Sequence, residues 1–293
     1  MDPVELIKLR SLMDTSSGNR EITIGIIDGP IDLTHEAFQG SRIRAVRESQ
    51  LSACKSASSI ACVHGTFIVG MLCAQRGVSA PSICPGCEII LRPIFREDLQ
   101  IEKASNTVIF PISTPEELSN AIVETIDAGS KIINLSLGLS TSSLIVYREL
   151  QEAYDYALHK GVIIVIAAGN QGNIGSISLV RHAWPIPVAA CSKSGIFDPI
   201  SNFGTSIGNH GLMAPGQDIS STAPGGQYIQ MSGTSAAAPF VTGTIALLWS
   251  IFPTATAADI RHAILRGSDY NRRRTIIPPL INAEQALKTL RSI

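Results

Sequence analysis

The chain lacks several features that would indicate a nucleic-acid-binding, repetitive or membrane protein. Only 16% of its 293 residues are charged and the formal net charge is −1, so neither nucleic acid nor an anionic membrane is an expected partner. No internal repeat is evident, and no apolar run reaches the roughly 18 residues expected of a membrane span. Residues 1–20 contain no basic stretch followed by an apolar one, which predicts no secretory signal and a cytoplasmic location.

Apolar content and its pattern predict a single large α/β domain. Hydrophobic residues make up 45% of the chain, enough for an extensive core. Apolar segments typical of strands alternate with segments typical of helices along the whole sequence. This alternation predicts a doubly wound, mostly parallel sheet, with a functional site at the carboxyl ends of its strands. We expect one domain over residues 1–293, with residues 1–20 as an N-terminal extension, and nothing in the pattern indicates an oligomeric state.

Four of the six cysteines lie in two close pairs. Cys54 and Cys62 bracket a Ser/Ala segment, and Cys84 and Cys87 flank a Pro-Gly turn. Four thiols could hold zinc, but the wider spacing does not suit a usual zinc knuckle, and disulfides Cys54–Cys62 and Cys84–Cys87 are equally compatible with the pattern. Without a secretory signal we expect thiols that oxidise in purified protein. Buried apolar positions are expected for the remaining two, Cys73 and Cys191.

Two polar clusters are expected to be solvated turns. Asp32, His35 and Glu36 could bind a metal, but their local spacing is more typical of an exposed turn. The basic segment 272–274, between two helices expected in the tail, is more typical of a solvated loop than of a binding patch.

Ser235 precedes the longest apolar segment of the chain. Residues 236–249 are almost wholly apolar, which predicts a helix buried on all sides, with Pro239 tolerated in its first turn. A hydroxyl at a helix N-terminus lies where unpaired N–H groups stabilise negative charge, which suits a nucleophile whose reaction produces an oxyanion. A serine that only caps a core helix fits this segment equally well.

Three other segments supply the partners that a serine nucleophile needs. Residues 24–28 form an apolar strand ending at Asp28, and residues 162–169 form another that ends just before Asn170. His64 stands at the start of a helix expected over residues 65–75. A lone histidine there is more often structural, and the Gly-Thr that follows it permits close packing against a strand end. A base oriented by an acid is, however, what activates a serine hydroxyl.

The order of Asp28, His64, Asn170 and Ser235, within the segments IIDG, HGT, AAGN and GTSAAAP, resembles the subtilisin-like serine proteases, or subtilases. The resemblance covers roughly residues 20–290 and implies a three-layer fold acting on peptides. It implies that Ser235 attacks a peptide carbonyl while His64 accepts its proton. It also implies that Asp28 orients His64 and that the Asn170 amide and the Ser235 N–H bind the oxyanion.

The same resemblance implies where a substrate binds. The segment Ser136, Leu137 and Gly138 would pair with the substrate backbone and form one wall of the S1 pocket, and Ala167, Ala168 and Gly169 would form the other. An ordinary strand-to-loop turn is the alternative for the first segment, and residues 105–117 show no match to the family's opposite binding edge. Subtilases hold calcium in a loop that corresponds to residues 76–83, which contain no carboxylate and no asparagine here, so we expect no cofactor.

A narrower resemblance is to the cyanobactin-maturation subtilases, the patellamide-type proteases. It rests on the paired cysteines around His64, the altered calcium loop, the Ala-Ala-Ala-Pro-Phe segment after Ser235, and the absence of a signal and propeptide. Such enzymes remove the leader of a ribosomal precursor peptide or cyclise it, and the cyclising type carries an inserted helical segment. Only 35 residues separate Asp28 from His64, which favours hydrolysis. A macrocyclase, a degradative subtilase and a non-catalytic peptide-binding module are the alternatives.

Overall fold

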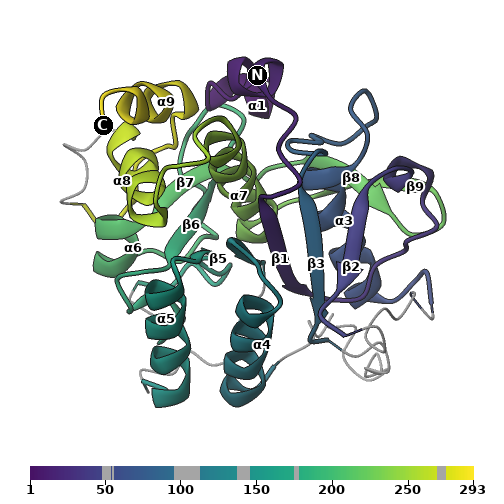
Figure 1. Cartoon of the computed structure of the whole chain (residues 1–293), viewed down its shortest axis with the longest axis horizontal. Coiled ribbons are helices and arrows are strands. Elements are labelled where there is room, and N and C mark those ends of the chain that lie inside the picture. The colour runs from purple at the N-terminus through teal and green to yellow at the C-terminus, as the bar shows by residue number, and fades with distance from the viewer. Residues whose placement is uncertain (48–53, 55, 96–112, 137–145, 175–177, 269–274) are drawn as a thin grey trace.

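A seven-stranded parallel sheet forms the centre of the molecule (Figure 1). The computed structural model describes residues 1–47, 54, 56–95, 113–136, 146–174, 178–268 and 275–293. The strand order is β2-β3-β1-β4-β5-β6-β7, and every neighbouring pair is parallel. The strands are β1 (Thr23–Asp28), β2 (Arg42–Ala45), β3 (Glu88–Pro93), β4 (Ile132–Leu135), β5 (Ile163–Ala167), β6 (Ile186–Cys191) and β7 (Leu212–Pro215). A separate antiparallel hairpin joins β8 (Ile219–Ala223) to β9 (Gln227–Met231).

Burial explains why the strands read as apolar runs and not as alternating patterns. All residues of β1, β4, β5, β6 and β7 are buried, as expected where helices cover both faces of a parallel sheet. β2, at the edge, is largely exposed and carries two arginines.

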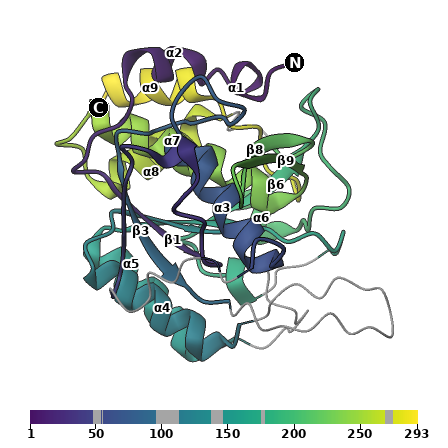
Figure 2. The ribbon, with the colours of Figure 1, turned by 90° about the vertical axis from the view of Figure 1, so that its right-hand side faces the viewer.

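Helices cover the sheet on both faces (Figure 2). Helices α4 and α5 lie on one face, and α3 and α7 lie on the other together with α8 and α9. The α-helices are α1 (Pro3–Leu6), α2 (Arg10–Thr15), α3 (Ile60–Cys73), α4 (Pro115–Asp127), α5 (Arg148–Lys160), α6 (Thr205–His210), α7 (Thr234–Ile251), α8 (Ala257–Gly267) and α9 (Ala283–Arg291); η1 (Glu36–Phe38) and η3 (Ser178–Val180) are 3-10 helices. The predicted α/β fold with a doubly wound parallel sheet is confirmed.

Helix α7 corrects one expectation from the sequence. It is 18 residues long and apolar enough, by length and composition, to cross a membrane, whereas no run of that length was expected. However, 83% of it is buried inside the protein, where it packs against β4, β5, β6 and β7. It is therefore the core helix of a globular domain. Pro239 is its sixth residue and not part of its first turn, so one intrahelical hydrogen bond is lost.

The strand order fixes where a site can form. From β1 the chain builds β2 and β3 on one side of that strand, then crosses and adds β4 to β7 on the other. The switch point therefore lies between β1 and β4, and the crevice outside the carboxyl ends of such strands is where ligands bind in open α/β sheets. Asp28 ends β1, and Ser136 directly follows β4.

Candidate active site

Asp28 and His64 form a buried hydrogen-bonded pair. Asp28 is fully buried and His64 is 8% exposed. The Oδ1 of Asp28 lies 2.7 Å from His64 Nδ1 and also accepts the backbone N–H of Gly29 at 2.7 Å. A carboxylate in this position holds the Nδ1–H tautomer of the ring, which leaves Nε2 as the basic nitrogen.

Glycines allow helix α3 to approach the end of β1 this closely. A Cβ on Gly65 would lie 2.5 Å from the Pro30 carbonyl oxygen, and a Cβ on Gly29 would lie 2.0 Å from that of Ala61. The close packing expected next to His64 is therefore present, and it is what brings the imidazole onto Asp28.

The start of α3 differs from the sequence prediction. The helix begins at Ile60, with the Ser59 side chain accepting the N–H of Cys62, so His64 lies in the second turn and not at the N-terminus. From the hairpin, Ser221 Oγ donates to the Phe67 carbonyl and Thr222 Oγ1 to the Thr66 carbonyl, both at 2.8 Å. These two bonds anchor α3 directly after the histidine.

The electrostatics of the pair favour a charged imidazole. Burial lowers the pKa of His64, but the negative charge of Asp28 and its hydrogen bond outweigh burial, and the pKa lies above the ordinary value of 6.5. An imidazolium formed during a reaction would be stabilised in the same way.

Ser235 is the second residue of α7. The residue capping the helix is Gly233, whose φ of 125° suits glycine, so the interpretation of Ser235 as an N-cap is wrong. The Ser235 hydroxyl donates to the Ser136 carbonyl at 3.0 Å. Since a hydroxyl has one hydrogen, it must turn from this acceptor before it can donate to any other group. The N–H of Ser235 is one of the first-turn donors that have no acceptor within the helix.

The Asn170 side chain is fixed against the residue before Ser235. Its Oδ1 accepts both the backbone N–H and the hydroxyl of Thr234, each at 2.9 Å. The Thr234 hydroxyl in turn accepts the N–H of Gly169 at 3.1 Å. Because two donors face Oδ1, the orientation of the amide is determined and Nδ2 remains as a donor beside the start of α7.

The strand register places the four predicted catalytic residues at one edge of the sheet, as two hydrogen-bonded groups: Asp28 with His64, and Ser235 and Asn170 each with a neighbouring residue. Ile27 and Leu135 are partners in the register of β1 and β4, so Asp28 and Ser136 end neighbouring strands. Ser136 contacts Ser235, and Asn170 contacts Thr234.

The structure describes only part of the predicted substrate-binding segments. Ser136, Ala167 and Ala168 are buried at the ends of β4 and β5, whereas Leu137 and Gly138 lie outside the described residues. Gly169 follows with a φ of 97°.

Sequence reasoning missed the role of Asn202 at this wall. Its backbone N–H donates to the Gly169 carbonyl at 2.9 Å, and its Nδ2 donates to the Ala168 carbonyl at 3.1 Å. Its Oδ1 accepts the N–H groups of Gln171 and Asn173. The side chain is 1% exposed and holds the loop that carries Asn170. The only signal in the sequence was an asparagine before Phe-Gly in a turn.

The cysteine pairs have different states. Cys54 is bonded to Cys62, two residues before His64, whereas Cys84 and Cys87 are buried thiols, so the second of the two disulfides considered is not formed in this structure. The Cys84 thiol hydrogen-bonds to Cys87 and lowers the pKa of Cys87, while the pKa of Cys84 is raised.

Asp32, His35 and Glu36 do not come together as a metal site. Among the described residues, no group of three or more His, Cys, Asp or Glu side chains could hold a metal ion. His35 is 2% exposed, which corrects the expectation of a solvated turn. Its Nδ1 accepts the Ala37 N–H, which leaves Nε2 to donate to the Gln227 carbonyl at 3.0 Å. Asp32 accepts the N–H of Gly225, so both side chains tie this turn to the hairpin.

The loop where subtilases hold calcium contains a guanidinium instead. Arg76 donates to the carbonyls of Met13 and Ser16 in the N-terminal segment and to those of Ser82 and Ile83 in the loop itself. Calcium binds six to eight oxygen ligands, usually including carboxylates. These carbonyl oxygens already accept from a fixed positive group, so the residues present do not fit the ion.

The chain matches the subtilase family, Peptidase S8, over residues 19–277. It belongs to that family. It is 30% identical over 261 residues to a thermophilic serine proteinase of Bacillus sp. strain AK1, covering 87% of this chain and 58% of that one. Among solved structures, it is similar to the patellamide maturation protease PatA, with 28% identity, a TM-score of 0.76, and coverage of 94% and 98%. The prenylagaramide maturation protease PagA shares the fold, with 24% identity, a TM-score of 0.81, and coverage of 96% and 98%.

The chain covers different fractions of the curated subtilases and of the solved maturation proteases. The chain spans 58% and 65% of the length of the first curated subtilases it matches, but nearly the whole of the maturation protease domains.

Proposed function

We propose that this chain is a serine endopeptidase that removes the leader from a ribosomally made precursor peptide. The observation that carries the proposal is that the hydrogen-bonded pair of Asp28 and His64 lies at the same edge of the sheet as Ser235 and the Asn170 amide. The likeness to PatA over 94% of the chain supports a precursor peptide as the substrate.

In the proposed reaction Ser235 Oγ turns from the Ser136 carbonyl to His64 Nε2 and attacks the scissile carbonyl carbon. His64 accepts the hydroxyl proton and later gives it to the leaving amine, while Asp28 stabilises the imidazolium. The oxyanion of the tetrahedral intermediate accepts from Asn170 Nδ2 and from the Ser235 N–H. Water then attacks the ester carbonyl, with His64 again as base, and releases the carboxyl product and free Ser235.

The substrate peptide is proposed to bind between the ends of β4 and β5. The walls are the segments that contain Ser136, Leu137 and Gly138 and Ala167, Ala168 and Gly169. A peptide added beside a strand end takes its affinity from main-chain hydrogen bonds and its selectivity from side-chain pockets.

Hydrolysis is favoured over cyclisation by the connection from β1 to α3. Residues 29–47, 54 and 56–59, which the structure describes there, contain η1 and β2 but no α-helix that could shield the acyl-enzyme from water. We further propose that the enzyme works without a metal, with no nucleic acid or membrane partner, and in the cytoplasm, where precursor peptides are made.

Mass spectrometry of products tests this function. The protein and its Ser235→Ala variant are incubated with a library of precursor-like peptides. Cleavage after one short motif, absent with the variant, is expected. A product lighter by one water than the linear fragment would identify a macrocyclase, and broad digestion of casein would identify a degradative enzyme. No product from either folded protein would overturn the proposal in favour of a peptide-binding module.

A further inference from the structure

The buried carboxamide of Asn202 is bonded through both of its polar atoms to the loop around Asn170. Its Oδ1 accepts the backbone N–H of Gln171 at 3.2 Å and that of Asn173 at 3.0 Å. Its Nδ2 donates to the Ala168 carbonyl at 3.1 Å and to Gln171 Oε1 at 2.7 Å. Because N–H groups face one atom and oxygens face the other, the orientation of this amide is determined.

The contacts of Asn202 bracket Asn170 along the chain. The Asn202 backbone N–H donates to the carbonyl of Gly169, the residue before Asn170, and Oδ1 accepts from Gln171, the residue after it. Gly169 permits the close approach, since a Cβ there would lie 2.4 Å from Asn202 Nδ2. Both peptide groups that flank Asn170 are therefore bonded to one buried residue.

The Asn170 amide has little freedom to absorb a movement of its backbone. Its Oδ1 accepts two bonds from Thr234, and a Cβ on Gly233 would lie only 3.0 Å from its Nδ2. A shift of the Asn170 backbone would therefore strain these bonds or displace Nδ2. An oxyanion donor works only within a narrow range of distance, and a displacement of about 1 Å in an active site costs on the order of 10² in rate.

The wall expected to bind substrate depends less on Asn202. The Ala168 N–H donates to the Val188 carbonyl in β6, and the Gly169 N–H donates to the Thr234 hydroxyl. Neither bond involves the Asn202 side chain, whereas the two N–H groups that donate to its Oδ1 would lose their acceptor. Removing the side chain should therefore disturb the oxyanion donor more than the substrate wall.

We propose that Asn202 is a positioning residue for the oxyanion site, acting on the reaction through Asn170 without touching the substrate. The proposal rests on the proposed function, because it gives Asn202 a part in that reaction. In Asn202→Ala, kcat on a blocked tetrapeptide anilide should fall by about thirtyfold, while KM should change by less than about threefold. A rise in KM as large as the fall in kcat would contradict it.

A double-mutant cycle tests whether the effect passes through Asn170. The Asn170→Ala enzyme has no amide left to misplace, so adding Asn202→Ala should lower its kcat by less than about twofold. Independent effects would multiply instead. A further loss of about thirtyfold in the Asn170→Ala background would overturn the proposal.

A milder variant is available if circular dichroism shows that Asn202→Ala is not folded. Asn202→Ser retains a polar group, but its hydroxyl is one bond shorter than Oδ1 and cannot hold both N–H groups. Its kcat should fall by about tenfold, and this loss should again disappear in the Asn170→Ala background. A loss that persists there would count against the proposal in the same way.

Ser201→Ala is the matched control at the neighbouring position. Ser201 is fully buried, and its hydroxyl accepts the Ala190 N–H at 2.9 Å, on β6 and not on the loop of Asn170. This variant loses a buried hydrogen bond of the same turn and should keep kcat within about twofold of wild type. A kcat loss equal to that of Asn202→Ala would indicate a general effect of loosening the turn and would overturn the proposal.

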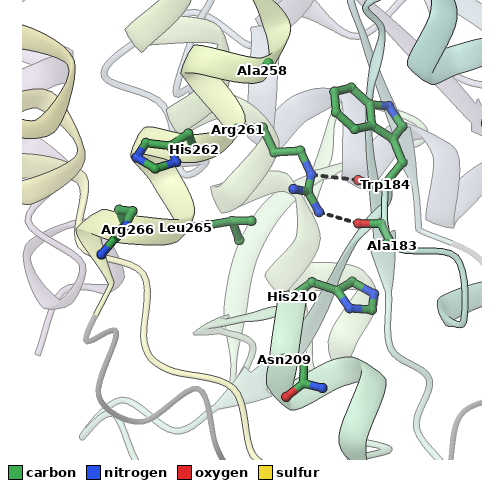
Figure 3. Close-up of a pocket in the computed structure, with 9 residues that line it drawn as sticks. All are labelled: Ala183, Trp184, Asn209, His210, Ala258, Arg261, His262, Leu265 and Arg266. Carbon is green, nitrogen blue, oxygen red and sulfur yellow. Dashed lines mark hydrogen bonds between the residues drawn. The ribbon is translucent and has the colours of Figure 1, made fainter. Parts of the chain in front are cut away.

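Arg261→Met controls for lost stability far from the site. Arg261 lies in a pocket lined by α6, α8 and the segment before β6, where its guanidinium donates to the carbonyls of Ala183 and Trp184 (Figure 3). These residues precede β6, whereas the proposed site lies at the carboxyl ends of the strands. The variant should lower Tm and leave kcat unchanged. An equal kcat loss would show that reduced stability alone explains the effect of Asn202→Ala.

Hydrogen exchange keeps this proposal distinguishable from the proposed function. Mass spectrometry of peptides that cover residues 168–174 measures the protection of the N–H groups that Asn202 holds. Exchange there should be faster in Asn202→Ala and unchanged in Ser201→Ala. If the wild-type enzyme cuts no peptide, the proposed function fails, and the exchange result still decides whether Asn202 holds the loop. Unchanged exchange in Asn202→Ala would overturn the present proposal alone.

Discussion

Ser136 Oγ donates to the backbone carbonyl of Ser235 at 3.1 Å, a carbonyl for which helix α7 itself supplies no N–H donor. The carbonyl of residue 235 would normally accept the N–H four residues later, but that residue is Pro239, which has none. The Ser235 hydroxyl donates in the opposite direction, to the Ser136 carbonyl. The proline thus leaves an acceptor open, and the end of β4 uses it to hold the nucleophile's backbone.

Removing this contact should impair catalysis more than folding. In Ser136→Ala the Ser235 carbonyl loses its donor in a partly buried position, at a cost of about 1–2 kcal/mol. We expect kcat/KM on a peptide anilide to fall by about tenfold through kcat, with Tm lowered by a few degrees. Thr242→Val is the matched control. The Thr242 hydroxyl donates to the Asn134 side chain, and the Asn134 amide donates to Ser136 Oγ, so this variant perturbs Ser136 indirectly. A smaller kinetic effect in Ser136→Ala than in this control would contradict the idea.

The pH dependence of the reaction should reflect the Asp28–His64 pair. The base must be neutral to accept the serine proton, so kcat/KM rises as the pH passes the pKa of His64 in the free enzyme. Because that pKa is raised, the inflection should lie above pH 6.5.

Asp28→Asn checks the origin of this shift. The substitution removes the charge that favours the imidazolium, so any residual activity should show its inflection at lower pH. The rate should drop by about 10⁴, the scale for loss of the acid in a serine-protease triad. An inflection that stays at the same pH in this variant would show that another group titrates.

The residues of the proposed catalytic site were apparent in the sequence because each follows a short local pattern. Apolar strands ending in Asp28 and Asn170 and a glycine-flanked His64 need only neighbouring residues to be recognised. What failed depends on contacts between distant segments. The cap at Ser59, which starts α3 early, and the burial of His35 against the hairpin are examples.

Supporting polar groups were equally hidden from sequence reasoning. Asn202 joins four backbone groups of a loop about 30 residues earlier, and Arg76 spans a separation of 63 residues to reach Met13. Such bonds follow from the tertiary packing and not from any local pattern.

The Asn170 amide is expected to act only on the transition state. Asn170→Ala should lower kcat by about 10² to 10³ with little change in KM, the magnitude known for the oxyanion asparagine of subtilisin itself. Thr234→Val is informative beside it, since it removes one of the two donors that orient the amide and should cost about tenfold. A large rise in KM for Asn170→Ala would instead indicate a role in substrate binding.

Arg76 should carry the stabilising role that calcium has in related loops. It joins the N-terminal segment to the loop after α3 through four carbonyls, and its fork of donors has no equivalent in lysine. Arg76→Lys and Arg76→Met should therefore both lower the free energy of unfolding, by about 2 kcal/mol for the methionine variant, which leaves partly buried carbonyls unsatisfied. Arg20→Met, in the nearby N-terminal segment, is the control. EDTA should leave the Tm of the wild-type protein unchanged, and a fall in Tm that calcium reverses would refute the assignment.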